Sequence, residues 1–206
     1  MFDFVIWDFD GTLFDTYPLI VETYINELAL LGIKESDERV ERLVRTSFGT
    51  LHRYLSESYG LGSEFWEKCS NSRRGEEQKR AFAFKGAFGL LSDIIALGGR
   101  NAIYTHRGAS TFSLLEKAGM KNLFCDFVTE ADNFPPKPSP DAVEALIARN
   151  GASKERAIMV GDREIDVGSG INAGINACLF RALSFENTEA NFTARDYAEL
   201  RKIILG

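Results

Sequence analysis

The sequence predicts an α/β protein: a parallel five-stranded sheet with helices on both faces, and a small all-helical domain inserted after the first strand. From residue 86 onward, helix-like and strand-like segments alternate, which is typical of a parallel sheet. Residues 17 to about 80 contain only helical patterns. The chain has 206 residues and 45% hydrophobic content, enough for one core domain and an insertion.

The elements of the core follow from apolar runs that end at glycines and polar turns. Right-handed crossovers through the intervening helices make the strands parallel, so we expect a Rossmann-like arrangement. Gly119, Gly151 and Gly174 are the expected stops of three helices. Strands are predicted at residues 2–9, 101–105, 124–129, 156–160 and 175–180, and helices at 86–97, 109–118, 140–149, 165–173 and 194–204.

The insertion carries no convincing strand. Its helices are predicted at residues 17–31, 35–44, 51–59 and 63–69, and the polar run 70–79 is interpreted as the segment that returns to the core. The expected division is therefore a core domain of residues 1–15 and 81–206 and a helical cap domain of residues 16–80. An insertion at this point is expected to cover the carboxyl end of the first strand, where open α/β sheets bind ligands.

Composition excludes several classes of partner. A formal net charge of −6 argues against nucleic acid and against an anionic membrane surface. The chain has no signal-like leader, no apolar span, and three cysteines without metal-like spacing, so we expect a cytoplasmic protein with reduced thiols. The expected partner is a small metabolite, and the expected assembly is a monomer or weak homodimer.

Polar side chains follow four of the predicted strands. Asp8 and Asp10 end the first strand, and Thr105, followed by His106, ends the second. Lys137 stands among prolines after the third strand, and Asp162 and Asp166 follow the fourth. Because the carboxyl ends of parallel strands meet at one edge, these side chains should converge.

The residue types indicate phosphoryl chemistry. Asp8, Asp162 and Asp166 form an oxygen-rich site that suits Mg²⁺, whereas only two histidines make zinc a poor candidate. Lys137, Thr105 and the loop amides near Gly11 and His106 can hold a phosphoryl dianion. An ionised Asp8 can then attack phosphorus, and Asp10 can protonate the leaving oxygen and later take a proton from water.

The chain resembles the haloacid dehalogenase-like (HAD) superfamily, and within it the phosphoglycolate-phosphatase-like hydrolases with a helical cap. The resemblance rests on DFDGTLFDT at 8–16, YTHRG at 104–108, PPKPSPD at 135–141 and GDREIDVGSGINAGI at 161–175. It implies that Asp8 is the nucleophile and a metal ligand, and that Asp10 is the acid/base and binds the metal through its backbone carbonyl. It also implies that Thr105 and Lys137 hold the phosphoryl group, while Asp162 and Asp166 complete the metal site.

Two further implications concern substrate contacts. His106 stands where relatives often have Asn, which bears on substrate choice if its side chain enters the pocket. In relatives, a turn comparable to residues 45–50 approaches the substrate, so Arg45 and Ser47 are candidate specificity contacts.

The sequence therefore predicts a Mg²⁺-dependent phosphatase that hydrolyses a small phosphorylated metabolite through a phospho-aspartyl intermediate. One alternative is a β-phosphoglucomutase-like mutase, which carries a histidine in the first cap helix that residues 17–31 lack. A dehalogenase lacks the second acid and needs no Mg²⁺. A non-catalytic binder of phosphorylated ligands is the alternative from another class.

Overall fold

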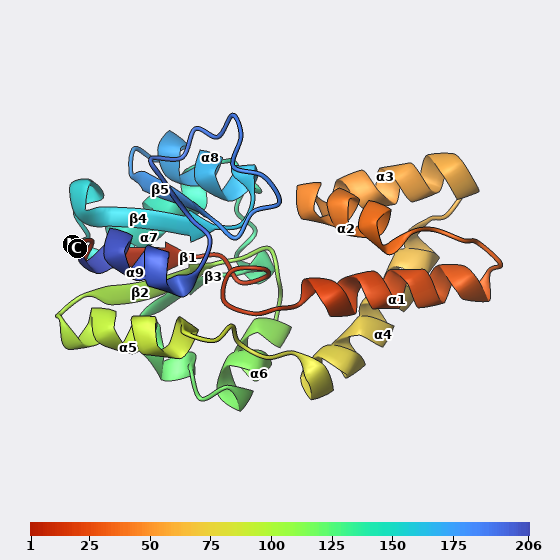
Figure 1. The fold of residues 1–206 in the computed structure, drawn as a ribbon, viewed down its shortest axis with the longest axis horizontal. Coiled ribbons are helices and arrows are strands. Elements are labelled where there is room, and N and C mark those ends of the chain that lie inside the picture. Colours follow the sequence, from red (N-terminus) through yellow and green to blue (C-terminus); the bar gives the residue numbers. More distant parts are fainter. The chain divides into compact units, whose positions relative to one another are not determined.

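A computed structural model describes all residues from Met1 to Gly206 (Figure 1). The chain divides into two compact units. The core unit comprises Met1–Asp15 and Phe82–Gly206, and the helical unit comprises Thr16–Ala81. No helix combines the length and the hydropathy that a membrane span requires.

The core unit is built on one fully parallel sheet, which confirms the predicted fold class. The strand order is β3-β2-β1-β4-β5-β6, so β1 lies in the interior of the sheet between β2 and β4. All four residues of β1 are buried, as expected for an apolar run with neighbours on both sides. The strands are β1 (Phe4–Trp7), β2 (Arg100–Tyr104), β3 (Asp126–Val128), β4 (Ala157–Gly161), β5 (Asn176–Phe180) and β6 (Phe192–Ala194).

The expected number of five strands is wrong, because β6 adds a sixth at the edge of the sheet. This strand has three residues, of which only Ala194 is buried. So short a segment has no measurable two-residue periodicity, and its strand conformation depends on pairing with β5, where Cys178 lies opposite Phe192. Tertiary pairing, rather than local pattern, forms this strand.

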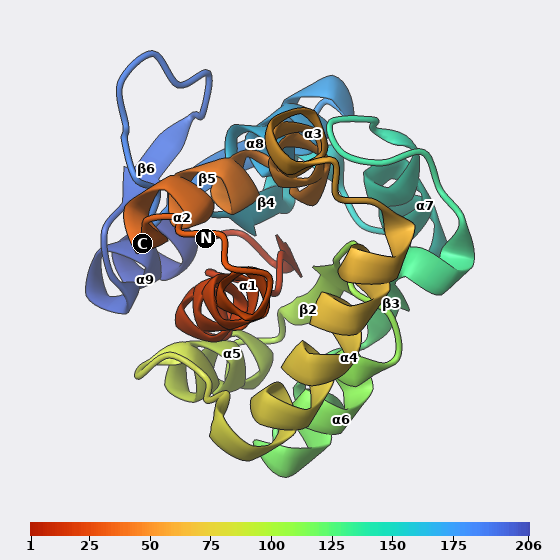
Figure 2. The same ribbon diagram turned by 90° about the vertical axis from the view of Figure 1, so that its right-hand side faces the viewer.

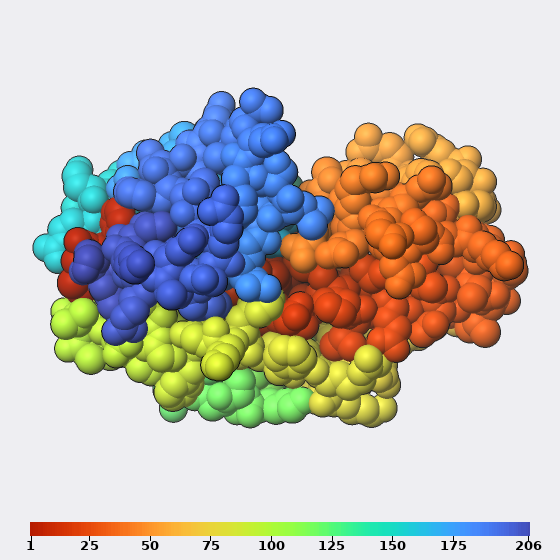
Figure 3. All heavy atoms as spheres, in the orientation of Figure 1, coloured from red at the N-terminus to blue at the C-terminus, as the bar shows by residue number.

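Helices cover both faces of the sheet. One face carries Phe4, Ile6 and Met159, which pack with side chains of α7 in a buried cluster. On the other face, α5 and α9 contact each other, and Figure 3 shows the yellow-green and blue segments side by side. The helices of the core unit are α5 (Ala87–Ala96), α6 (Ser110–Lys117), α7 (Asp141–Asn150), α8 (Glu164–Asn172) and α9 (Tyr197–Leu205), with short 3-10 turns at Lys121–Leu123, Glu130–Asp132 and Lys154–Arg156.

A buried polar contact fixes α5 against the sheet. The indole nitrogen of Trp7 donates to the Asn101 side chain at 3.0 Å, and the Asn101 amide donates to the Leu91 carbonyl of α5 at 3.1 Å. Each of these groups is removed from water, so each needs a partner inside the protein. The contacts therefore set how α5 lies on strands β1 and β2.

The helical unit consists of four helices, α1 (Tyr17–Leu30), α2 (Asp37–Thr46), α3 (Phe48–Tyr59) and α4 (Ser63–Arg80). Helix α1 contacts both α2 and α4 (Figure 2). Their inward faces form a cluster around Tyr24, Leu28 and Leu51.

The interpretation of residues 70–79 as a polar return segment is wrong, because α4 continues through them. Glu77 is buried and lies 3.5 Å from the Arg73 guanidinium one turn away, and Ser72 donates to Glu27 of α1 at 2.7 Å. Glu, Gln, Lys and Arg are good helix formers, and pairs four residues apart support a helix without an apolar stripe. Polarity here reflects helix faces that meet water, not a loop.

The two connections between the units are paired with each other within the core unit. The Asp15 amide donates to the Phe82 carbonyl at 3.1 Å, and the Phe84 amide donates to the Leu13 carbonyl at 2.9 Å. Phe14 and Ala83 form an antiparallel bridge between these hydrogen bonds. The chain thus leaves and re-enters the core unit at one place.

Candidate active site

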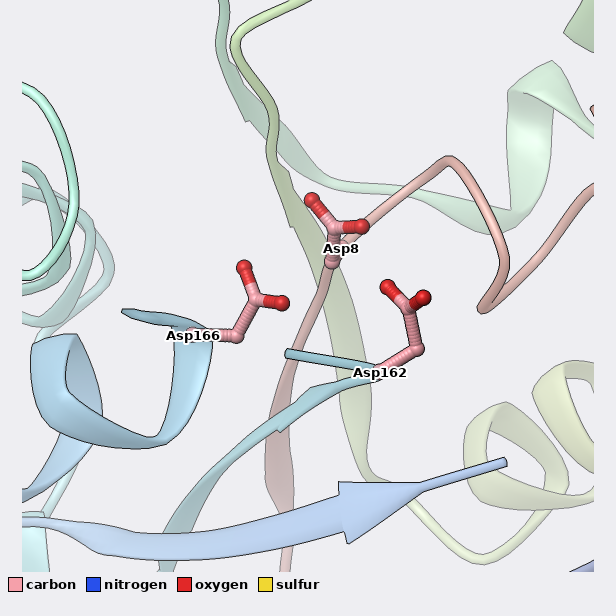
Figure 4. A group of neighbouring side chains, drawn as sticks. All are labelled: Asp8, Asp162 and Asp166. Carbon is pink, nitrogen blue, oxygen red and sulfur yellow. The ribbon is translucent and has the colours of Figure 1, made fainter. Parts of the chain in front are cut away.

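Three carboxylates meet at the carboxyl edge of the sheet. Asp8 follows β1, Asp162 follows β4, and Asp166 lies in the first turn of α8. One oxygen from each lies within 4.8 Å of the others, and all three residues are buried (Figure 4). The sequence predicted this convergence, because β1 and β4 are neighbouring parallel strands.

Gly161 allows Asp166 to reach this cluster. A Cβ atom at position 161 would lie 2.2 Å from the Asp166 Cβ and 2.4 Å from its carboxyl carbon. No contact between carbon atoms is that short, so either the strand end or the first turn of α8 would have to move. The glycine before Asp162 is therefore required by the packing of the site.

We expect Gly161→Ala to destabilise the protein by about 1–3 kcal/mol, the usual range for overpacking a buried site. It should also displace Asp166 and lower activity. Urea denaturation and steady-state phosphate release measure the two effects. Gly89→Ala is the matched control, because a Cβ there meets nothing within 4 Å. Equal stability of the two variants would contradict the prediction.

Lys137 links two of the three carboxylates. Its Nζ donates to Asp8 at 2.6 Å, to Asp166 at 2.7 Å and to the Tyr104 carbonyl at 2.9 Å. The side chain is fully buried, and the ammonium lies over the Tyr104 ring, 4.5 Å from its centroid. All three donor positions of the amine are used, so the cation has a fixed place beside Asp8.

The charges of this cluster are strongly coupled. Burial, and then the negative charge of Asp166, raise the pKa of Asp8 to about 6, against the opposing effect of Lys137 and Arg163. For Asp166, burial is outweighed by Lys137 and Arg163, and its pKa is lowered. Burial acts against the charge of Lys137 too, but Asp166 and Asp8 outweigh it and raise the pKa of the amine.

The donor set fits a hard divalent cation. Asp8 Oδ2 is buried and has no hydrogen-bond partner, a costly state for a carboxylate oxygen unless a cation belongs there. The three carboxylates lie near two cations, Lys137 and Arg163. The guanidinium nitrogens of Arg163 lie 3.7–3.9 Å from oxygens of all three carboxylates. One negative charge is left over, and oxygen ligands are those that Mg²⁺ prefers.

The structure places the Asp10 carboxylate outside this group of three. It forms a two-point ion pair with Arg107, Oδ1 with Nη2 at 2.5 Å and Oδ2 with Nε at 3.3 Å. Sequence reasoning did not single out Arg107. Its position two residues after Thr105, at the end of the strand beside β1, is the signal that could have found it.

Thr105 directly follows β2 and is buried, and its hydroxyl accepts the Arg107 amide at 3.1 Å. The Gly11 amide donates to the Phe14 carbonyl at 2.9 Å and so closes the turn after Asp10. Phosphate contacts for these two groups stay predictions. In this structure their polar atoms shape the loops around the carboxylates.

The His106 side chain supports the lysine loop. Its Nε2 accepts the Lys137 backbone amide at 3.1 Å, which requires the proton on Nδ1. His106 is exposed as a residue, but the protein atoms packed around its ring, and then the positive charges of Lys137 and Arg163, lower the pKa of the ring to about 4. His106 is therefore a neutral ring at physiological pH, placed to position Lys137.

Arg45 and Ser47 both have structural partners within the helical unit. Arg45 pairs with Glu41 at 2.9 Å, and its guanidinium carbon lies 3.9 Å from the centroid of the Tyr17 ring. Ser47 lies between α2 and α3 and accepts the Thr50 amide at 2.9 Å as the N-cap of α3. Contacts of either residue with a substrate stay predictions.

Comparison with known proteins gives a consistent result. The family model described as "Haloacid dehalogenase-like hydrolase" matches residues 5–180. A phosphoglycolate phosphatase from Rhodospirillum rubrum is 28% identical over 183 residues, which cover 83% of this chain and 76% of that protein. The pyrophosphatase PpaX of Bacillus velezensis is 27% identical over 175 residues, 82% of this chain and 79% of that protein. A solved structure from Lactobacillus delbrueckii subsp. bulgaricus shares the fold, with a TM-score of 0.85, 18% identity and coverage of 100% and 99% of the two chains.

Proposed function

This chain belongs to the haloacid dehalogenase-like hydrolase family, and from that premise we propose that it is a Mg²⁺-dependent phosphatase for a small phosphorylated metabolite. Relatives named as phosphatases place it among the phosphatase hydrolases of the family. The observation that carries the proposal is Asp8, a buried carboxylate with Lys137 at 2.6 Å and one oxygen without a partner.

In the proposed reaction, a carboxylate oxygen of Asp8 attacks phosphorus and the bond to the leaving oxygen breaks. Asp10, in its protonated form, gives its proton to that oxygen, and the product alcohol or phosphate departs. Water then attacks the phosphorus of the phospho-aspartate and gives a proton to Asp10. Asp8 is regenerated, inorganic phosphate is released, and Asp10 has regained its proton.

Lys137 and Thr105 have distinct places in this scheme. Lys137 holds a positive charge beside Asp8, so a phosphoryl dianion approaching the carboxylate meets a compensating cation. Thr105 is buried at the end of the neighbouring strand, and its hydroxyl hydrogen remains to be donated. His106 acts on the reaction through its hydrogen bond to the lysine loop.

Asp8, Asp162 and Asp166, with the backbone carbonyl of Asp10, would hold Mg²⁺. The ion would supply positive charge that lowers the repulsion between Asp8 and the substrate. Lys137 and Arg163, the two cations near Asp8, already compensate part of its negative charge.

The experiment that tests the function is phosphate release from phosphoglycolate, pyrophosphate and p-nitrophenyl phosphate, with Mg²⁺ and with EDTA. We expect release of inorganic phosphate that depends on Mg²⁺. When turnover of a substrate with a labelled phosphoryl group is quenched with acid, the label should remain on the protein. Phosphate release at full rate in EDTA would contradict the metal requirement. Release from none of the three substrates, across a wider set of phosphorylated metabolites as well, would contradict the function.

Metal binding should also be visible without turnover. We expect Mg²⁺ to raise the melting temperature of the wild-type protein, since a ligand that binds only the folded state stabilises it, by about 2.7 kcal/mol at 100 times its dissociation constant. Asp162→Asn should remove most of that increase. Asp141→Asn, a change at an exposed acid, should retain it. An equal Mg²⁺ effect in both variants would show that the ion binds elsewhere.

A further inference from the structure

The contact between Arg107 and Asp10 joins two loops at the carboxyl edge of the sheet. Asp10 lies in the turn after β1, and Arg107 follows β2, the adjacent strand. The Arg107 side chain is only 2% exposed, whereas that of Asp10 is 18% exposed. The guanidinium is thus an interior group that reaches toward an acid at the rim of the site.

Several neighbours hold Arg107 in place. Its amide donates to Thr105 Oγ1 at 3.1 Å, its carbonyl accepts the Glu130 amide at 3.2 Å, and its Nη1 donates to Ser110 Oγ at 3.2 Å. The guanidinium carbon lies 5.2 Å from the centroid of the Phe9 ring. Both the backbone and the guanidinium of Arg107 are therefore held in place. The orientation of the Asp10 carboxylate follows from the position of this guanidinium.

We propose that Arg107 is a positioning residue for Asp10, the acid/base of the proposed phosphatase reaction. The guanidinium engages both carboxylate oxygens and fixes the plane of the acid, which a single contact would leave free to rotate. It also holds this fourth carboxylate apart from the group formed by Asp8, Asp162 and Asp166. This inference rests on the proposed function.

The chemistry assigns Arg107 no proton transfer. The guanidinium stays a cation throughout. Asp10 gives its proton to the leaving oxygen and becomes the carboxylate that forms the two-point pair seen here, and this carboxylate then regains a proton from water. Arg107 acts by placing the acid, so its contribution should be largest for substrates whose leaving oxygen needs a proton. Phosphoglycolate is such a substrate, because an alkoxide is a poor leaving group. p-Nitrophenyl phosphate is not, because nitrophenolate departs without protonation.

A purely structural role makes a different prediction. The Arg107–Asp10 pair also ties the turn after β1 to the loop after β2, and loosening those loops would displace Asp8 and Thr105 as well. Hydrolysis of both substrates would then fall by the same factor. The ratio of the two rates separates positioning of the acid from general support of the site.

The test is a double-mutant cycle with Arg107→Met, Asp10→Asn and the combined variant, measured as kcat/KM for both substrates, which reports the step in which the leaving group departs and not the later hydrolysis of the phospho-aspartate. We expect Arg107→Met to lower kcat/KM for phosphoglycolate by at least about tenfold more than for p-nitrophenyl phosphate, within the range of a general acid's contribution. With Asn at position 10, adding Arg107→Met should change kcat/KM for phosphoglycolate less than about twofold. Arg201→Met, which breaks an exposed pair with Asp93, is the matched control and should leave both rates unchanged.

Arg107→Lys keeps the experiment decisive if the methionine variant does not fold. Lysine retains the positive charge but cannot bind both carboxylate oxygens at once. The ratio of the phosphoglycolate rate to the p-nitrophenyl phosphate rate should therefore fall in Arg107→Lys as well. Two results would overturn the inference: an equal loss of rate for both substrates, or losses from Arg107→Met and Asp10→Asn that multiply in the combined variant. Phosphate release by the wild type would still uphold the proposed function in either case. If the wild type releases phosphate from none of a wide set of phosphorylated metabolites, the proposed function fails, and this role of Arg107 fails with it.

Discussion

Asp8→Asn should lower phosphate release by at least about 10⁴-fold while the protein remains folded, because an amide cannot replace a carboxylate as nucleophile. The labelled phosphoenzyme that the wild type accumulates should be absent. Steady-state assays with p-nitrophenyl phosphate and acid-quench labelling measure both effects. Circular dichroism verifies the fold.

The same substitution should stabilise the protein without metal at neutral pH. The pKa of Asp8 is about 6 in the folded protein, against an ordinary value of 3.8. The folded state therefore holds this proton more tightly than the unfolded state, and stability falls as the pH rises from about 4 to 6. Above that range the ionised group costs up to about 3 kcal/mol, which asparagine does not incur.

Thermal melting in EDTA at pH 7.5 and at pH 4 tests this expectation. The melting temperature of Asp8→Asn should exceed that of the wild type by roughly 5–10 °C at pH 7.5 and match it more closely at pH 4. Asp141→Asn, at an exposed position, should show no such difference. A less stable Asp8→Asn protein at pH 7.5 would contradict the cost assigned to the ionised Asp8, and activity near that of the wild type would contradict its role as nucleophile.

Lys137→Met should have the second largest effect, on both catalysis and stability. Removing the amine takes away the cation beside Asp8, the proposed nucleophile, which should cost about 3 kcal/mol of transition-state stabilisation, roughly a 150-fold loss in kcat/KM. It also leaves Asp8 and Asp166 without the Nζ that bridges them. Removing one partner of a buried ion pair commonly destabilises a protein by about 3–5 kcal/mol.

Urea denaturation in EDTA at pH 7.5 and pH 4.5 measures the stability of Lys137→Met. The loss should be smaller at pH 4.5, because protonation of the carboxylates removes their need for a cation. Lys154→Met is the control, since that side chain is 46% exposed and lies 3.7 Å from Glu144. Equal stability losses for Lys137→Met and Lys154→Met would mean that the buried amine does not compensate the acids.

Much of the fold and of the convergence of the three buried carboxylates could be predicted from sequence because both depend on local patterns. The apolar run of β1 identifies a buried strand, and alternation with helices makes the sheet parallel. Parallel strands place their carboxyl ends at one edge, so Asp8 and Asp162 had to be near each other once β1 and β4 were neighbours. Apolar runs and their alternation with helices were sufficient to place these carboxylates at one sheet edge, and the adjacency of β1 and β4 came from the structure.

What sequence reasoning missed depends on contacts between distant residues. Arg107 and Asp10 are 97 positions apart. The position of Arg107 after β2 indicates the same sheet edge, but nothing in either segment indicates that the two side chains pair. The role of His106 as an acceptor for the Lys137 amide likewise follows only from the path of the loop around residues 135–138. The second half of α4 is stabilised by ion pairs and has no hydrophobic periodicity, so its sequence pattern predicts a polar segment instead of a helix.

The paired connections at residues 13–15 and 82–84 have a consequence for how this protein can diversify. The insertion begins and ends at these two connections. Hydrogen bonds and a β-bridge join the connections to each other, so the insertion is a loop with its ends held together. Doubling the length of such a loop adds only about 0.6 kcal/mol of closure entropy. The free energy of closing the junction therefore sets little limit on the length of the helical insertion that it carries.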